Sequence, residues 1–379
     1  MNKIIYIFFL LSLFACTNKN NITNKNTLII PKEIYSFSNN IQVDLFFKNI
    51  YTIHLETKPE ILIKNIFQIY LYNNLFFIFH DSEISIFDFS GKFVRKIGKQ
   101  GNGPGEYRYL PQGVAFHNKY IYLSDYLLEK IFVYNIQGEY IKSINTNRNI
   151  TQLKILNDTF LIGYTPNCNG HKPNKLYFYT MDGIAIDSIK NDIIYKNFKS
   201  SISFTNEHPM FITHNNLIGF KEVLSDTLYS INSNLSLNPF LILNLGDIKL
   251  TPDDIYNQKD IFKSLDHEKK VLEIFFDNEN YMIFHDQDSR YTCIIWDKEK
   301  QKVNNVKFLY NKDFAKQFNK EKNHIQIDPK DESSRIMTKD GTPYFMPISV
   351  SEDNKYLIGY ETSATNEDDN PIIVLAEMK

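Results

Sequence analysis

Residues 84–97 read ISIFDFSGKFVRKI: a short apolar strand that closes on an aromatic residue, a polar turn, and a second strand. The phrase recurs as IFVYNIQGEYIKSI at 131–144, LYFYTMDGIAIDSI at 176–189, TLYSINSNLSLNPF at 227–240 and CIIWDKEKQKVNNV at 293–306. Its anchoring aromatics step by 47, 45, 50 and 67 residues, and they are Phe87, Tyr134, Tyr179, Tyr229 and Trp296. Several short strands repeated at about 40–50 residues are typical of a β-propeller.

The repeated unit divides into four strands, which in the first unit are ILIKNIFQIYL, NLFFIFH, ISIFDF and KFVRKI between residues 61 and 97. A sixth unit supplies only three strands, PISV at 347–350, YLIGYE at 356–361 and PIIVLAE at 371–377, before the chain ends. An open edge would leave backbone groups unpaired, so we expect the strand IYTIHLE at 50–56 to close this blade. The sequence therefore predicts an all-β, monomeric, six-bladed propeller of four-stranded blades, whose sixth blade joins both ends of the ring.

Two insertions interrupt the repeat. The stretch 251–276 opens with Thr-Pro-Asp-Asp, an N-cap followed by proline at the first helical position, and predicts a short helical insertion before the fifth blade. The stretch 311–340 is highly charged and predicts a long loop or a short helix on one face.

The N-terminus carries the features of an export signal, with Lys3 followed by an apolar run over 4–14. Eleven apolar residues are too few to span a bilayer as a helix, which needs about 20. The run ends in Leu-Phe-Ala-Cys at 13–16, which resembles a bacterial lipobox and implies lipidation of Cys16 after cleavage. An ordinary secretory peptide with a chance cysteine is the alternative. We assign 1–15 to the signal peptide, 16–44 to a lipidated cysteine with a polar tether, and 45–379 to the propeller.

The net charge and the cysteine positions limit the partners and the disulfides that we expect. The net charge of −2 shows no basic excess, so we expect no nucleic-acid partner. Cys168 and Cys293 fall in different repeat units, and nothing in the pattern brings their Cα atoms within the roughly 7 Å that a disulfide requires. We expect both to be free or buried, with a disulfide as the alternative.

The segment KIGKQGNGPGEY at 96–107 resembles the hallmark of the six-bladed β-propeller lipoproteins of Bacteroidetes, which are similar in shape to NHL-repeat and TolB-like propellers. HLET at 54–57, DTLYSI at 226–231 and the insertion after NLG at 244–246 fit the same resemblance. Lys300 at a hairpin position and the missing aromatic of the sixth unit depart from it. The resemblance implies a periplasmic or surface propeller and no particular chemistry. Thr17 stands where, by resemblance to enterobacterial rules, an aspartate would retain a lipoprotein in the inner membrane, so we expect an outer-membrane lipoprotein that faces the periplasm, with the cell surface as the alternative.

His and Asp recur at the end of the second strand, as His80 with Asp81, His285 with Asp286, and Asp125 alone. These residue types bind metals, so a ligand or metal site at the channel mouth is one interpretation. Aspartate at the head of a β-turn also caps the turn backbone, which is the structural alternative.

Glu106 and Tyr107 of the glycine-rich segment are the remaining candidate ligand contacts. The segment lies between strands, so it matches neither a phosphate-binding P-loop nor a dinucleotide-binding loop, and we expect no cofactor. No GxSxG or HExxH motif indicates a catalytic residue. We expect a module that binds a peptide, a glycan or an envelope protein. The alternative is a lyase-like or lactonase-like propeller enzyme, possibly metal-dependent, with its site at the central channel.

Overall fold

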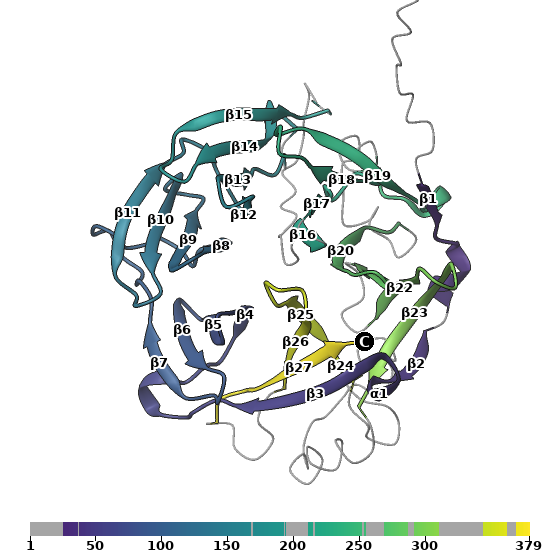
Figure 1. Ribbon diagram of the computed structural model, residues 1–379, viewed down its shortest axis with the longest axis horizontal. Coiled ribbons are helices and arrows are strands. Elements are labelled where there is room, and N and C mark those ends of the chain that lie inside the picture. Colours follow the sequence, from purple (N-terminus) through teal and green to yellow (C-terminus); the bar gives the residue numbers. More distant parts are fainter. Residues whose placement is uncertain are drawn as a thin grey trace, which may run out of the picture.

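The described residues form six β-sheets arranged as blades around a central axis, so the predicted propeller fold is confirmed (Figure 1). The computed structural model describes residues 26–36, 38–167, 170–192, 194, 211–214, 217–251, 254, 269–286, 292–310, 344–361 and 369–379. The insertion predicted at 311–340 lies outside these ranges, and so does 255–268 of the insertion predicted at 251–276. The last residues of the latter stretch form the strand β20 (Leu272–Asp277), so the predicted insertion extends too far. Thr251 and Asp254 are described, and their side chains hydrogen-bond to each other's backbone N–H groups, as expected of a helix N-cap. No helix in the described ranges is long and apolar enough to cross a membrane.

The first three blades each consist of four consecutive antiparallel strands. Blade 1 contains β4 (Ile66–Tyr72), β5 (Leu75–His80), β6 (Glu83–Asp88) and β7 (Phe93–Lys96). Blade 2 contains β8 (Gly113–His117), β9 (Tyr120–Asp125), β10 (Lys130–Asn135) and β11 (Tyr140–Asn145). Blade 3 contains β12 (Gln152–Leu156), β13 (Phe160–Tyr164), β14 (Asn174–Thr180) and β15 (Ala185–Lys190).

The other three blades include strands from the N-terminal part of the chain. Blade 4 contains β16 (Phe211–His214), β17 (Leu217–Phe220), β18 (Thr227–Ile231), β19 (Leu237–Asn244) and β1 (Asn26–Ile29). Blade 5 contains β20 (Leu272–Asp277), β21 (Tyr281–Asp286), β22 (Cys293–Asp297), β23 (Lys302–Leu309), β2 (Asn39–Gln42) and β24 (Tyr344–Phe345). Blade 6 contains β25 (Pro347–Val350), β26 (Tyr356–Glu361), β27 (Ile372–Met378) and β3 (Phe47–His54).

The sixth blade is closed by β3, as the sequence predicts. This strand pairs antiparallel with the C-terminal β27, in a register that places Ile53 opposite Ile373 (Figure 1). The carboxylate of Glu377 on β27 accepts hydrogen bonds from the Asn49 amide (2.8 Å) and the Tyr51 hydroxyl (3.2 Å) on β3. The two ends of the ring are therefore joined by a backbone ladder and by side-chain contacts.

The expected tether over 16–44 needs correction, because the chain belongs to the propeller body from Asn26 onward. The strand β1 pairs parallel with β19, and β2 pairs parallel with β23, so each covers the outer edge of a blade. Between them lies a short 3-10 helix, Lys32–Ser36, and the helix α1 (Val43–Phe46) leads into β3. The reason is apolar burial: Leu28, Ile30, Ile34 and Val43 are each at most 8% exposed.

Apolar clusters between neighbouring blades hold the ring together. Six such clusters occur among the described residues, one at each interface between blades. The anchoring aromatics pack into them: Phe87, Tyr134 and Tyr179 are at most 2% exposed, while Tyr229 and Trp296 are partly buried. The repeated phrase therefore encodes packing between blades.

Two further features concern single residues. Gly91, in the hairpin between β6 and β7, has φ +84°, and an added Cβ would lie 2.0 Å from the carbonyl oxygen of His54 on β3. Glycine is therefore required where blade 1 meets the closing strand. Cys293 is a buried free thiol whose burial raises its pKa to about 12. Cys168 lies outside the described residues, so the expectation for that thiol stays a prediction.

Candidate functional site

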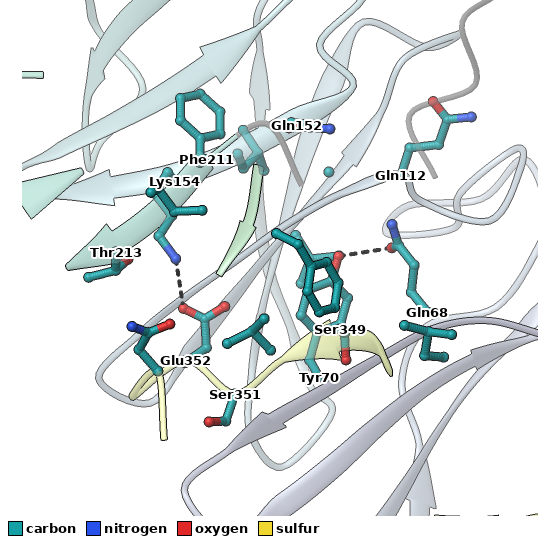
Figure 2. Close-up of a pocket in the computed structure, with 18 residues that line it drawn as sticks. Gln68, Tyr70, Gln112, Gln152, Lys154, Phe211, Thr213, Ser349, Ser351 and Glu352 are labelled. Carbon is teal, nitrogen blue, oxygen red and sulfur yellow. Dashed lines mark hydrogen bonds and ion pairs between the residues drawn. The ribbon is translucent and has the colours of Figure 1, made fainter. Parts of the chain in front are cut away.

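The innermost strands of the six blades surround the propeller axis (Figure 1). Residues on or next to all six of these strands line a cavity of about 100 Å³, which Figure 2 shows in close-up. These strands are β4, β8, β12, β16, β20 and β25, each the first strand of its blade. The innermost strands converge on the channel because every blade begins at the axis and proceeds outward. The cavity is thus a product of the whole ring.

The channel has two distinguishable ends. Because all blades repeat the same antiparallel order, their first strands run in the same direction along the axis. Gln112 and Gln152 lie where first strands begin, which we name the starting end. Glu352 and Asn354 follow the end of β25 and lie at the opposite, finishing end. At the starting end, Gly113 permits close packing between blades 2 and 3, because an added Cβ would approach the Cα of Gln152 to 3.1 Å.

An ion pair crosses the channel between opposite sides of the ring. The Lys154 ammonium on β12 of blade 3 lies 3.0 Å from the Glu352 carboxylate of blade 6, and Figure 2 shows the two side chains pointing toward each other. The side chains are 20% and 26% exposed, so the pair is partly screened by solvent. It restricts the channel on the side of the finishing end.

Amide and hydroxyl groups make up most of the other polar lining. Gln68 on β4 accepts a hydrogen bond from the Tyr70 hydroxyl (2.9 Å), and both side chains border the cavity (Figure 2). Burial raises the pKa of Tyr70, and the nearby Glu352 carboxylate raises it further, so this phenol stays protonated. The Ser349 hydroxyl donates to the Ile69 carbonyl (2.5 Å), which fixes β25 against β4. The lining can donate and accept hydrogen bonds with little net charge.

The predicted residues of blade 1 lie one strand away from the channel. His80 is 1% exposed and pairs with the first residue of β4 across the sheet. Its Nδ1 lies 3.0 Å from the Asp81 carboxylate, and its Nε2 lies 2.8 Å from the Ser85 hydroxyl. The Asp81 carboxylate accepts from the Lys64 backbone N–H (3.2 Å). These contacts tie the end of β5 to β6 and to the segment that precedes β4.

In blade 2, Asp125 has the same local role. Its carboxylate accepts three backbone N–H groups, from Arg108 at 2.6 Å, Leu127 at 3.1 Å and Leu128 at 3.0 Å. The side chain is 2% exposed. Asp125 therefore fixes the turn after β9 and ties it to the segment that enters blade 2.

Glu106 and Tyr107 act within the glycine-rich connection between blades 1 and 2. The Glu106 carboxylate accepts from the Gly103 N–H (2.8 Å) and pairs with Lys99 (2.9 Å), and the Lys99 contact is the main reason that its pKa is lowered. Tyr107 is fully buried, and its hydroxyl donates to the Ser82 carbonyl (3.2 Å). Both residues stabilise the shape of the connection.

In blade 5, His285 and Asp286 are also buried beside the inner strand. The His285 ring stacks on Phe275 at 4.1 Å between centroids, and Phe275 itself borders the cavity. The Asp286 carboxylate lies 3.4 Å from the Lys270 ammonium. Of the predicted residues, His285 comes nearest to influencing the channel, through the aromatic ring that it supports.

None of these seven residues, all within the described part of the chain, lines the cavity. They sit on separate blades, and the described ranges contain no group of three or more His, Cys, Asp or Glu placed to hold a metal ion. Cys16 lies outside the described residues.

The sequence contains a pattern that marks part of the cavity lining. Polar residues interrupt the otherwise apolar first strands of the first three units, in NIFQIY at 65–70, PQGVAF at 111–116 and TQLKIL at 151–156. Glutamine occurs in all three, at the third residue of β4, just before β8 and at the first residue of β12, and each of these glutamines borders the cavity. The partnership of Lys154 with Glu352 has no such signal, because 198 residues separate them.

The chain matches one family model and resembles several solved structures. A family model described as "Domain of unknown function (DUF4934)" matches residues 26–377. A search of curated proteins finds none that matches the chain. The crystal structure of a Bacteroides fragilis NCTC 9343 protein, named as an exported protein, is 18% identical and superposes with a TM-score of 0.64, covering 93% of this chain and 100% of that one. At this identity, the likeness concerns the fold.

Two other solved structures are more distant. One is a Bacteroides thetaiotaomicron VPI-5482 protein of unknown function, 11% identical, with a TM-score of 0.45 and coverage of 86% of this chain and 75% of that one. The other is an inactive virginiamycin B lyase from Staphylococcus aureus with quinupristin, 9% identical, with a TM-score of 0.45 and coverage of 86% and 99%.

Proposed function

The chain belongs to the DUF4934 family, a domain of unknown function, and we propose that it is a ligand-binding propeller whose site is the central channel. The observation that carries the proposal is the axial cavity, to which all six blades contribute and which the Lys154–Glu352 pair restricts at one side. Such concave sites with a few convergent polar groups are the usual form of small-ligand sites. The ligand enters from the starting end, where Gln112 is exposed.

The described lining favours binding over catalysis. Its only charged side chains are Lys154 and Glu352, which neutralise each other. The Ser351 hydroxyl donates to the Asp353 carboxylate (2.5 Å), but it also accepts from the Lys355 and Tyr356 backbone N–H groups, as a hydroxyl that holds a turn does. Amides, hydroxyls and aromatic rings supply the hydrogen bonds and apolar contacts by which ligands are recognised. The partner is one of the three that the sequence suggests: a peptide, a glycan or a segment of an envelope protein.

A plug at the channel mouth tests this function. Gln112→Trp should abolish binding and leave the fold intact, because Gln112 is exposed at the starting end. Gln137→Trp, at an exposed turn between β10 and β11, is the matched control. A library of short peptides and of neutral and charged sugars is screened by thermal unfolding. A ligand at a hundred times its Kd stabilises by about 2.7 kcal/mol. If the plugged variant keeps the full shift, the ligand binds elsewhere and the proposal is wrong.

We also propose that the propeller is a lipoprotein of the outer membrane, anchored through Cys16. The support is the apolar run over 4–14 followed by Leu-Phe-Ala-Cys. Each buried acyl CH₂ adds about 0.8 kcal/mol of membrane affinity, so an anchor with more than one chain holds firmly. The anchor would place the propeller at the membrane surface, where its channel is accessible to ligands of the envelope.

Fatty-acid labelling in cells tests the anchor. The native chain should incorporate a labelled fatty acid and sediment with the outer membrane, whereas Cys16→Ser should do neither. Cys293→Ser is the control, because this buried cysteine lies in the propeller body. Equal labelling of native chain and Cys16→Ser would show that Cys16 is not the lipidated residue.

A further inference from the structure

We infer that the channel binds a neutral, hydroxyl-rich ring, namely a terminal uncharged sugar residue of a glycan; this inference rests on the proposed function. It follows from three properties of the described lining: its charge balance, its hydrogen-bonding groups and its size.

Charge balance disfavours an ionic ligand. Lys154 and Glu352 form a pair at 3.0 Å and are the only charged side chains among the described lining residues. A ligand with a net charge would have to pair with one of them and leave the other without its partner in a confined site. A neutral ligand leaves the pair intact.

The hydrogen-bonding groups match hydroxyls. Glutamine side chains from three successive blades border the cavity: Gln68 from blade 1, Gln112 at the entrance to blade 2 and Gln152 from blade 3. Each carboxamide offers two donors and an acceptor, and each sugar hydroxyl is also both donor and acceptor. Because Gln68 accepts from the Tyr70 hydroxyl, the planar carboxamide is held in place, and this bond uses neither of its two N–H donors.

Apolar lining completes the match, since a sugar ring also presents C–H faces. Phe211 at the start of β16 and Tyr70 of β4 border the cavity on different blades, and Figure 2 shows both rings beside the polar groups. Aromatic rings beside amide groups give the mixed surface that a pyranose requires.

Size sets the limit at one ring. About 100 Å³ of space corresponds to roughly three waters at their liquid share of about 30 Å³ each. The hydroxyls of a single ring can replace the hydrogen bonds of such waters. A peptide could insert only one side chain, and its backbone would find no further room.

Isosteric sugars test the inference directly. Glucose, glucuronate and glucosamine share a ring and differ in charge, and galactose, galacturonate and galactosamine form a second such set. Each is tested at about 10 mM by saturation-transfer NMR against the full-length chain, kept in a detergent without a sugar headgroup. Tripeptides form the competing arm. We expect a neutral sugar to bind more tightly than its charged isosteres and the peptides. If no neutral sugar binds, or if a charged isostere or a peptide binds more tightly, the inference is wrong.

Lining variants then locate the site. Gln112→Ala and Gln152→Ala should each weaken sugar binding about two- to tenfold, the effect of one hydrogen bond, while the exposed Gln137→Ala should not. Thermal unfolding checks that Gln152→Ala, which removes a buried side chain, still folds. If a charged sugar or a peptide binds instead and the same variants weaken it, the channel stands and the neutral-ring inference falls. If sugar binding ignores every lining variant, the channel proposal falls.

Removing one partner of the Lys154–Glu352 ion pair tests the charge argument, because a purely structural role of the pair would leave the ligand preference unchanged. Glu352→Gln leaves the Lys154 charge alone in the channel and should shift preference from glucose toward glucuronate. Lys154→Met leaves the Glu352 charge alone and should shift preference toward glucosamine. Unchanged preference in both variants would overturn the argument that the pair selects a neutral ligand.

Discussion

Closure of the ring by β3 makes a quantitative prediction about Ile53 and Ile373. These side chains lie opposite each other in the β3–β27 ladder, in the cluster between blades 6 and 1, and are 5% and 0% exposed. Truncation to alanine removes three carbon atoms from each, about 2.4 kcal/mol of transfer free energy at 0.8 kcal/mol per group. The remaining cavity adds to this, so we expect each single variant to lose about 3 kcal/mol of unfolding free energy.

The interaction between Ile53 and Ile373 is measured with the variant that carries both substitutions. Directly opposed side chains stabilise each other, so removing the second costs less once the first is gone. The Ile53→Ala/Ile373→Ala double variant should therefore lose about 5 kcal/mol instead of the additive value of about 6, a coupling free energy of about 1 kcal/mol. Urea unfolding of the four proteins, followed by tryptophan fluorescence and circular dichroism, measures the cycle.

A distant pair provides the control. Ile131 on β10 is fully buried but belongs to the cluster between blades 2 and 3. Ile53→Ala combined with Ile131→Ala should be additive within about 0.5 kcal/mol. Additive losses for the Ile53–Ile373 pair as well would refute the register, and with it the closure of blade 6 by the N-terminal strand.

Three further predictions concern charged residues. Burial lowers the pKa of Lys221 from 10.5 to about 8, so the unfolded chain binds more protons between those values; unfolding free energy should rise with pH there, and Lys221→Met should remove that rise. The Asn49 hydrogen bond lowers the pKa of Glu377 below 4.5; its stabilisation is present above pH 4.5 and lost as pH falls below it, so Glu377→Gln should flatten the acid limb of a urea-unfolding series. Asp125→Ala should cost about 1–3 kcal/mol in the same assay, because three backbone N–H groups lose their acceptor, and should leave ligand binding in the channel unchanged.

The sequence predicts the ring because the same packing problem is solved in every blade. An aromatic such as Phe87 must fill the interface with the next blade, and this requirement recurs wherever the interface recurs. The sixth unit has only three strands, so its edge needs a partner strand. The predicted strand at 50–56 is the one that no other unit uses, and it is therefore expected to fill this place. Repetition and the need to pair backbone groups were sufficient for this part of the fold.

The strands β1 and β2 could not be predicted in the same way. Each is four residues long and occurs once, so no repeat marks it, and a short apolar run within a polar segment resembles a tether. Their pairing is parallel and joins residues more than 200 positions apart, such as Asn26 with Leu241. Only the assembled blade shows that its outer edge has room for another strand.

The residues singled out by the repeat and the residues that line the cavity lie on different strands, for a similar reason. Periodicity identifies which residues are equivalent among blades, such as Asp81 and Asp286, but it does not give their distance from the axis. Residues at the end of the second strand satisfy local backbone groups, whereas the first strand borders the channel. The proposed binding site in the channel therefore rests on the glutamines of the first three blades and not on the recurring aspartates.

Ring closure and the channel are mechanically connected through blade 6. The inner strand β25 belongs to the blade that β3 completes, and it is tied to its neighbours by side-chain contacts with backbone carbonyls: Ser349 donates to Ile69 of blade 1, and Asn354 donates to Asp277 of blade 5 (2.5 Å each). Glu352 lies between these two anchors. Its position opposite Lys154 therefore depends on a closed ring, and any loosening of the β3–β27 ladder should weaken the Lys154–Glu352 ion pair. The pairing between the chain ends thus helps to shape the channel in which we propose that the ligand binds.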